Sequence, residues 1–211
     1  MRTAADFNRF YAVPDPWRIS RAKFRDRVFR KHLSRFVAGR SVLELGCGEG
    51  HLTQNVFSEA RFVTGIDISD VAIGRAKARN LANARFENCD FLRTSFEGYD
   101  VIAALECLYY LTPDEQDAFL KKAAREHAGK SLILSAPIIG ENKFRLYFTH
   151  EQLMATFARY RMTVLEFHNL SVYRRNVPAT LAAIGTRIAP PLLDWLPPRI
   201  IYQRLYKLWT M

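Results

Sequence analysis

The feature that most constrains the fold is an alternation of short apolar runs with helical patterns between residues 41 and 160. Most of the runs are continuously apolar, which is typical of strands buried on both faces of a parallel sheet. Parallel neighbours need a crossover connection, usually a right-handed one that contains a helix. The pattern therefore predicts an α/β protein with a doubly wound sheet. The expected strands are Ser41–Gly46, Arg61–Asp67, Ala84–Asn88, Tyr99–Leu105 and Lys130–Ala136, and the expected helices are Arg21–Phe36, His51–Phe57, Asp70–Asn80, Thr112–Glu126 and Thr149–Tyr160.

The end of the expected sheet follows a different pattern. Two β runs, Met162–Phe167 and Leu170–Arg175, are separated only by His168 and Asn169. That connection is too short for a crossover helix, so the two runs are expected to form an antiparallel hairpin.

Charge divides the chain into three parts. The net charge is +10, yet residues 42–170 contain 14 Lys and Arg against 17 Asp and Glu. Residues 1–41 contain 11 against 3, and residues 171–211 contain 6 against 1. A chain of 211 residues buries the core of one ordinary domain. We therefore expect an N-terminal helical lid at 1–40, a central domain at 41–175, and a basic amphipathic extension at 176–211.

Composition also limits the cellular setting. Three cysteines without CxxC spacing argue against a disulfide-rich secreted fold and against a structural zinc site. The first residues contain no apolar stretch of the kind found in signal peptides, and no apolar run is long enough to span a membrane. No metal is implied, since the histidines form no ligand pattern with Asp or Glu. We expect a cytoplasmic protein, with peripheral contact at the inner face of a membrane through 176–211 as an alternative.

A glycine-rich loop follows the first expected strand. Gly46, Gly48 and Gly50 let the backbone turn tightly and approach a ligand closely, with Cys47 between the first two. The spacing is G-x-G-x-G and differs from the G-x-G-x-x-G of dinucleotide-binding loops. Glu44, two residues before the first glycine, is expected to suit a ligand with an ammonium group better than a pyrophosphate.

Two more carboxylates end the next two expected strands. Asp67 closes the second strand, where a carboxylate accepts hydrogen bonds from ribose hydroxyls, and Ile68 beside it can pack on an adenine. Asp90 follows the third strand, within reach of the exocyclic amine of adenine, with Phe91 flanking the ring. A cationic amino-acid group, a ribose and an adenine without phosphate describe S-adenosylmethionine.

These residues carry a family resemblance. The run from Val42 to Leu111 resembles a class I S-adenosylmethionine-dependent methyltransferase, with motifs at Val42–Gly50, Gly65–Ile68, Asp90–Phe91 and Tyr99–Leu111. The resemblance implies a Rossmann-like, seven-stranded sheet with a terminal hairpin, and cofactor contacts that include Leu105. Several pieces, among them Asp15-Pro16-Trp17-Arg18, are similar to the nodulation protein S group of N-methyltransferases.

The acceptor is expected at the end of the fourth strand. Glu106 is the candidate to orient or deprotonate the acceptor, with Tyr109 as its hydrogen-bonding partner. The other candidate acceptor contacts are Trp17, Arg18, Tyr110 and His150. Structural interpretations stay open for all of these: strand ends and caps for the carboxylates, packing for the aromatic residues, and a first-turn position for His150.

Three functions remain open. The resemblance favours methyl transfer to an amine or hydroxyl of a small molecule, saccharide or glycolipid. The basic flanks are compatible with an RNA methyltransferase, although the residues after the fourth strand, Leu105-Glu106-Cys107-Leu108, differ from the Asn/Asp-Pro-Pro-Tyr of many base-modifying enzymes. A methyltransferase-like binding module without catalysis is the third alternative.

Overall fold

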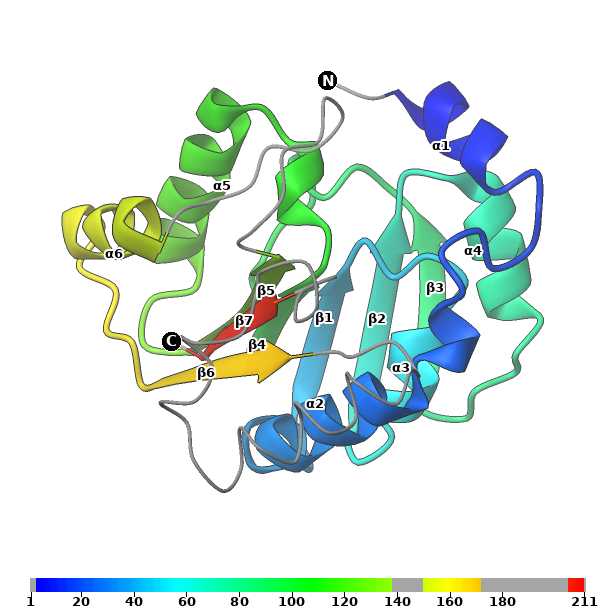
Figure 1. Cartoon of the computed structure of the whole chain (residues 1–211), viewed down its shortest axis with the longest axis horizontal. Coiled ribbons are helices and arrows are strands. Elements are labelled where there is room, and N and C mark those ends of the chain that lie inside the picture. The colour runs from blue at the N-terminus through cyan, green and yellow to red at the C-terminus, as the bar shows by residue number, and fades with distance from the viewer. Residues whose placement is uncertain (1–2, 138–149, 172–204, 211) are drawn as a thin grey trace, which may run out of the picture.

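A computed structural model describes residues 3–137, 150–171 and 205–210. Its strands form one sheet in the order β3-β2-β1-β4-β5-β7-β6 (Figure 1), in which β1 to β5 are parallel and β7 is antiparallel to both β5 and β6. The strands are β1 (Ser41–Leu45), β2 (Phe62–Asp67), β3 (Ala84–Asn88), β4 (Val101–Leu105), β5 (Ser131–Pro137), β6 (Glu166–Ser171) and β7 (Leu205–Thr210). The helices are α1 (Ala4–Phe10), α2 (Lys23–Val37), α3 (His51–Val56), α4 (Asp70–Lys77), α5 (Pro113–Glu126) and α6 (His150–Arg159), with short 3-10 turns η1 (Ile19–Arg21) and η2 (Leu108–Tyr110).

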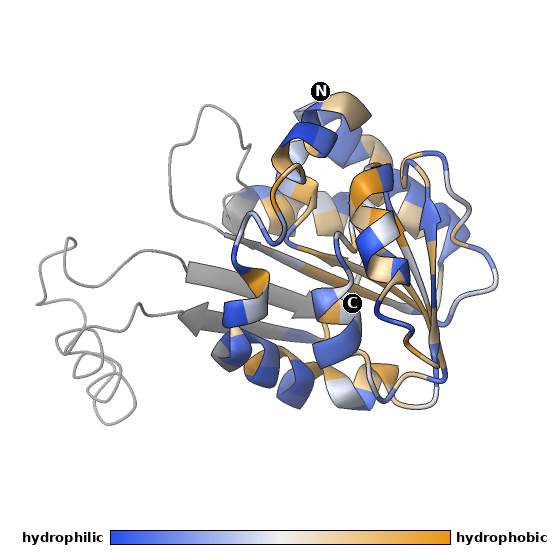
Figure 2. Ribbon diagram, turned by 90° about the vertical axis from the view of Figure 1, so that its right-hand side faces the viewer, coloured by the Kyte–Doolittle hydropathy of each residue, from blue (hydrophilic) through white to orange (hydrophobic). Residues whose placement is uncertain are grey.

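Helices cover both faces of this sheet. One apolar cluster joins the sheet to α2 and α3 and includes Phe29 and Val56, and a second joins it to α5 and α6 through Phe119 and Phe157. These four side chains are at most 1% exposed. Figure 2 shows hydrophobic residues along the strands and hydrophilic ones on the outer helix surfaces. Because helices cover both faces of the sheet, side chains on both faces of a central strand are buried, and the continuously apolar runs occupy these positions.

The five parallel strands and their helices confirm the doubly wound α/β class. The expected strands and helices differ from β1–β5 and α2–α6 by at most three residues at either end. Thr112 caps α5, because its hydroxyl accepts from the Glu115 N–H while the Glu115 carboxylate accepts from the Thr112 N–H. Thr149, where the last expected helix begins, lies outside the described residues. The seven-residue α1, which begins with a Thr3–Asp6 capping box, was not predicted.

The predicted C-terminal hairpin is wrong in its pairing. His168 and Asn169, expected in the turn, lie inside β6 and pair with Leu208 and Lys207 of β7. Residues 205–210, expected in the amphipathic extension, therefore belong to the sheet. The rest of the predicted extension, 176–204 and 211, lies outside the described residues, so its boundary and its membrane contact stay predictions. Among the described residues, no helix combines the length and apolarity needed to cross a membrane.

His127, at the end of α5, links stability to pH. It is 4% exposed, its Nε2 bonds to the Ser131 carbonyl at 3.0 Å, and burial lowers its pKa. The unfolded chain then binds a proton that the folded chain does not, so the free energy of unfolding should rise as pH increases toward about 6.5. Urea unfolding between pH 5 and 8 tests this. His127→Gln should reduce the slope without abolishing it, because the pKa of His51 is also lowered; an unchanged slope would contradict the assignment.

Candidate active site

The loop after β1 turns sharply through glycines with left-handed backbones. Gly46, Gly48 and Gly50 have φ angles of +65°, +55° and +74°, which residues with a side chain rarely adopt. A Cβ on Gly46 would lie 2.8 Å from Cβ of Cys107, and a Cβ on Gly48 would lie 2.5 Å from the hydroxyl of Tyr11. The loop is thus confined between the chain that follows β4 and the N-terminal segment.

Asp67 ends β2 beside this loop and is 7% exposed. Its Oδ2 accepts from the Gly48 N–H and its Oδ1 from the Ser69 N–H, both at 2.9 Å. Burial raises the pKa of the carboxyl, and the two backbone donors oppose that shift. Each carboxylate oxygen has two lone pairs, so Asp67 has acceptor capacity for a ligand beyond these two bonds.

A cavity of about 160 Å³ lies where β1, β2 and β4 end. This carboxyl edge is where open α/β sheets bind ligands, and Figure 1 shows α1 on the side toward which the arrowheads of β1 and β2 point. Most of the residues singled out from the sequence line the cavity. They are Trp17, Gly46, Cys47, Gly48, Asp67, Ile68, Asp90, Phe91, Leu105, Glu106, Tyr109 and Tyr110.

Glu44 does not line the cavity. Strand alternation directs it to the side of β1 on which α3 packs, where it is 1% exposed and accepts a 2.5 Å hydrogen bond from the Thr53 hydroxyl. Burial raises its pKa to about 8, so the carboxyl is mostly neutral at pH 7. The expectation that it faces the ammonium group of a ligand therefore needs correction: Glu44 packs behind the glycine loop.

Two other predicted residues also lie away from the cavity lining, and the side chain of a third lies outside the described residues. Gly50 is the N-cap of α3, and a Cβ there would lie 3.0 Å from Phe86. Arg18 has an exposed side chain and a left-handed backbone, and it precedes η1. His150 is the first residue of α6, and its side chain lies outside the described part of the structure.

Glu106 directly follows β4 and lines the cavity with an unusual backbone. Its φ is +59°, although it is not a glycine. Its N–H donates to the backbone carbonyl of Ser135 in β5 at 3.1 Å, and its Oε1 accepts from the Ser135 hydroxyl at 2.8 Å. Strained residues of this kind persist where the surroundings hold them and are concentrated at functional sites.

The N-terminal segment adds an aromatic wall that was only partly predicted from the sequence. Phe7 of α1 meets Tyr110 edge-on at 5.3 Å between ring centroids, and Tyr11 meets Trp17 at 5.0 Å. Phe7 and Tyr11 line the cavity together with Trp17 and Tyr110. The capping box at Thr3 was the available sign that a helix would present these rings.

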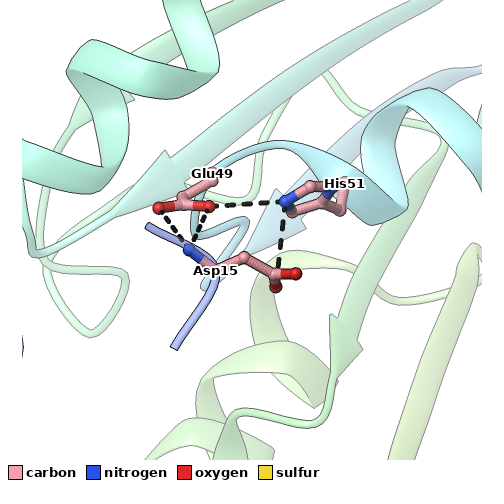
Figure 3. A group of neighbouring side chains, drawn as sticks. All are labelled: Asp15, Glu49 and His51. Carbon is pink, nitrogen blue, oxygen red and sulfur yellow. Dashed lines mark hydrogen bonds and ion pairs between the residues drawn. The ribbon is translucent and has the colours of Figure 1, made fainter. Parts of the chain in front are cut away.

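Glu49 fixes this segment to the glycine loop. Both oxygens of its carboxylate accept from the Asp15 N–H, at 3.1 and 3.0 Å, and Oε1 also accepts from Arg75 at 2.6 Å. Figure 3 shows the Glu49 carboxylate between Asp15 of the N-terminal segment and His51 at the start of α3. Ser69, the N-cap of α4, donates to Asn8 of α1 at 2.6 Å. These polar contacts fix Asn8 and Asp15 of the N-terminal segment, whereas α2, also within the lid predicted at 1–40, packs against the sheet.

Contrary to the expectation that the histidines form no ligand pattern with Asp or Glu, His51 lies close to two carboxylates in this cluster. Ligand atoms of Asp15, Glu49 and His51 all lie within 4.8 Å of one another. Two guanidinium groups compete with a cation there, because Arg75 pairs with Glu49 and Arg79 contacts His51 at 2.8 Å. Burial and Arg79 also lower the pKa of His51. The cluster is best described as a hydrogen-bonded junction, and we assign no metal to it.

Arg25 also lines the cavity and was not predicted from the sequence. It is 5% exposed in the first turn of α2, and its guanidinium donates twice to Asp26 Oδ1, at 3.1 and 2.7 Å. The Asp26 carboxylate also accepts from Asn55 at 2.8 Å. A buried arginine at a cavity wall has further N–H donors suited to a carboxylate. Its only sign in the sequence was an Arg–Asp pair in a helix rich in exposed cations.

Together these features define a class of protein. An open sheet of parallel strands in the order 3-2-1-4-5, with a glycine loop after β1 and a carboxylate at the end of β2, is a doubly wound nucleoside-binding fold. Residues 42–127 match the family model described as a methyltransferase domain.

Curated relatives agree with that match. Nodulation protein S of Bradyrhizobium diazoefficiens is 32% identical over 106 residues, which cover 47% of this chain and 51% of that protein. Ubiquinone biosynthesis O-methyltransferase of Coxiella burnetii is 31% identical over 102 residues, or 46% of this chain and 43% of that protein. The chain thus spans about half the length of the curated relatives it matches.

Solved structures share the fold over almost the whole chain. The N-methyltransferase NodS of Bradyrhizobium japonicum, in complex with S-adenosylhomocysteine, has a TM-score of 0.68 at 18% identity and covers 100% of this chain and 97% of its own. Magnesium protoporphyrin IX methyltransferase of Synechocystis, with bound S-adenosylmethionine, has a TM-score of 0.66 at 14% identity and covers 99% and 97%. The chain resembles class I S-adenosylmethionine-dependent methyltransferases, nodulation protein S among them, and the comparisons support S-adenosylmethionine as its cofactor.

Proposed function

We propose that this chain is an S-adenosylmethionine-dependent methyltransferase that acts on an amine or hydroxyl of a small molecule, saccharide or glycolipid. The observation that carries the proposal is that one cavity joins the glycine loop and Asp67 to Glu106. The loop and Asp67 suit a cationic nucleoside, and Glu106 places a proton acceptor beside it. The matching methyltransferase domain and the relatives that methylate nitrogen or oxygen support the same function.

The residues at the β2 and β3 ends of the cavity fit the proposed cofactor. Asp67 is the acceptor for the ribose hydroxyls and Asp90 for the adenine amine, while Ile68 and Phe91 offer apolar surface to the ring. Arg25 suits the carboxylate of the amino-acid part. When bound, S-adenosylmethionine would supply a methyl group on a positively charged sulfonium, which is the electrophile of the proposed reaction.

The remaining cavity residues serve the acceptor. In the proposed reaction the bound cofactor would supply the methyl group, and Glu106 would orient the acceptor and take up the proton that the acceptor loses on methylation. Tyr109 and Tyr110 border the same space, and Trp17 covers it with the N-terminal aromatic rings. Positioning the acceptor in line and excluding water account for most of the rate in such a methyl transfer.

Glu106→Gln is expected to lower kcat by about 100-fold at saturating substrate near neutral pH, the usual contribution of a general base. Glutamine preserves the size of the side chain but accepts no proton. Initial rates from pH 6 to 9 measure the effect, and calorimetry should give an unchanged affinity for S-adenosylhomocysteine. Full turnover by the variant across that range would remove Glu106 from this role.

The decisive test of the function is methyl transfer from labelled S-adenosylmethionine to a panel of amino- and hydroxyl-bearing saccharides, lipid intermediates and RNAs, with products identified by mass. We expect label on a small or saccharide acceptor. Label on RNA, with binding that weakens steeply as salt increases, would favour the RNA alternative. Tight cofactor binding without transfer to any of these acceptors would favour a binding module.

A further inference from the structure

Glu106 holds a backbone conformation that its residue type rarely adopts. A φ of +59° places it in the left-handed region, which costs free energy for a residue with a Cβ. The position immediately follows β4 at the cavity wall. The surroundings must therefore stabilise this turn, and hydrogen bonds with the neighbouring strand β5 do so.

Ser135 lies across from this turn in β5. The strand register pairs Leu105 with Ser135, so the next residue, Glu106, leaves the sheet beside the serine. The Ser135 hydroxyl accepts from the Glu106 N–H at 3.1 Å and donates to Glu106 Oε1 at 2.8 Å. The backbone carbonyl of Ser135 accepts from the same N–H at 3.1 Å. One hydroxyl thus contacts both the backbone and the carboxylate of one residue.

The hydroxyl that makes these contacts is buried among apolar residues. The exposed fraction of Ser135 is 1%, and Ile133 and Leu134, which precede it, are buried as well. A hydroxyl in such surroundings needs hydrogen-bond partners inside the protein, and Glu106 supplies an N–H donor and a carboxylate acceptor. The other buried serine of the strand, Ser131, lies at the opposite end, where Arg40 approaches its hydroxyl at 3.5 Å.

We propose that Ser135 is a positioning residue that holds the Glu106 carboxylate at the acceptor side of the cavity. The inference rests on the proposed function and adds to it a residue that never touches the acceptor. In Ser135→Ala the Glu106 N–H still donates to the backbone carbonyl of residue 135, so the turn keeps that hydrogen bond. The carboxylate, by contrast, loses its hydroxyl anchor. The loss should therefore appear in turnover and not in cofactor binding.

The experiment compares Ser135→Ala with Ser131→Ala, a matched removal of a buried hydroxyl from the same strand. Ser135→Ala should lower kcat about tenfold, with the dissociation constant for S-adenosylhomocysteine within about twofold of the parent. The acid limb of its pH–rate profile should move to higher pH, because the carboxylate loses a donor that favours its charged form. Ser131→Ala should change neither kcat nor the pH profile, and Ser135→Thr, which keeps the hydroxyl, should restore most of the rate.

A double-mutant cycle separates positioning from packing. In a Glu106→Ala background, Ser135→Ala should change kcat by less than about twofold, because the group it positions is gone. Equal losses in both backgrounds would overturn the inference while leaving the methyltransferase function intact. No transfer by the parent chain would overturn both. Urea unfolding of the four cofactor-free proteins gives a second readout: non-additive shifts of the midpoint are expected, and strictly additive shifts would show that the two side chains do not interact.

Discussion

Gly46→Ala is expected to abolish measurable binding of S-adenosylmethionine and to lower the free energy of unfolding by about 3 kcal/mol. Left-handed backbone costs an alanine about 1–2 kcal/mol, and overpacking a tight site adds about 1–3 kcal/mol. The new Cβ would lie 2.8 Å from Cβ of Cys107, an atom close to the main chain that cannot rotate away. The loop must then shift, and the cavity that it lines with Asp67 changes shape. Calorimetric titration and urea unfolding measure the two effects.

Two other glycines provide matched controls for this prediction. Gly98 has a φ of +81°, but a Cβ added there would meet no atom within 4 Å, so Gly98→Ala isolates the cost of the backbone conformation. Gly74 lies within α4 with open space around it, and Gly74→Ala should stabilise the chain by up to about 1 kcal/mol. Both variants should bind the cofactor normally. Equal affinity of the Gly46 variant would show that the loop does not contact the ligand.

Asp67→Ala is expected to raise the dissociation constant for S-adenosylmethionine at least about 100-fold. Each hydrogen bond to a charged acceptor contributes about 1.5–3 kcal/mol, and a loss of about 1.4 kcal/mol corresponds to a factor of ten. Two ribose hydroxyls would lose their acceptor. The variant should also unfold more easily, because the N–H groups of Gly48 and Ser69 lose the carboxylate that accepts from them.

Asp100→Ala is the control for that loss of stability. Asp100 accepts from the Ser41 N–H and hydroxyl, both at 2.8 Å, at the opposite end of the parallel strands. Its removal should also lower the free energy of unfolding but leave cofactor affinity unchanged. If both aspartate variants bind equally well, Asp67 does not contact the ligand and the assignment of the ribose site is wrong.

Much of the fold was predictable because its central strands are buried on both faces. Such strands are continuously apolar, and the helices between them have clear caps, as at Thr112. The pairing of β6 was not predictable in this way. Its partner β7 begins at Leu205, more than thirty residues later, and sequence proximity favoured a local hairpin that the protein does not form.

The candidate site likewise contains residues that could be predicted from the sequence and residues that could not. Asp67, Asp90 and Glu106 were predictable because parallel strands bring their carboxyl ends to one edge. Glu44 was misassigned, although strand alternation already places it on the face opposite Leu43 and Leu45. Phe7 and Tyr11 reach the cavity because the N-terminal segment docks on Glu49 and Ser69, and Arg25 reaches it because α2 packs against the sheet and α3. That docking depends on contacts between distant residues, which no local pattern reveals.

The central claim is that the cavity at the end of β1 and β2 binds S-adenosylmethionine. Calorimetric titration of the full chain with S-adenosylmethionine, S-adenosylhomocysteine, ATP and NAD tests it most directly. We predict one-to-one binding of the two sulfur nucleosides, loss of both in Asp67→Ala, and no binding of ATP or NAD at the same concentration. Binding of ATP or NAD in preference to both sulfur nucleosides, or no binding of either sulfur nucleoside, would contradict it.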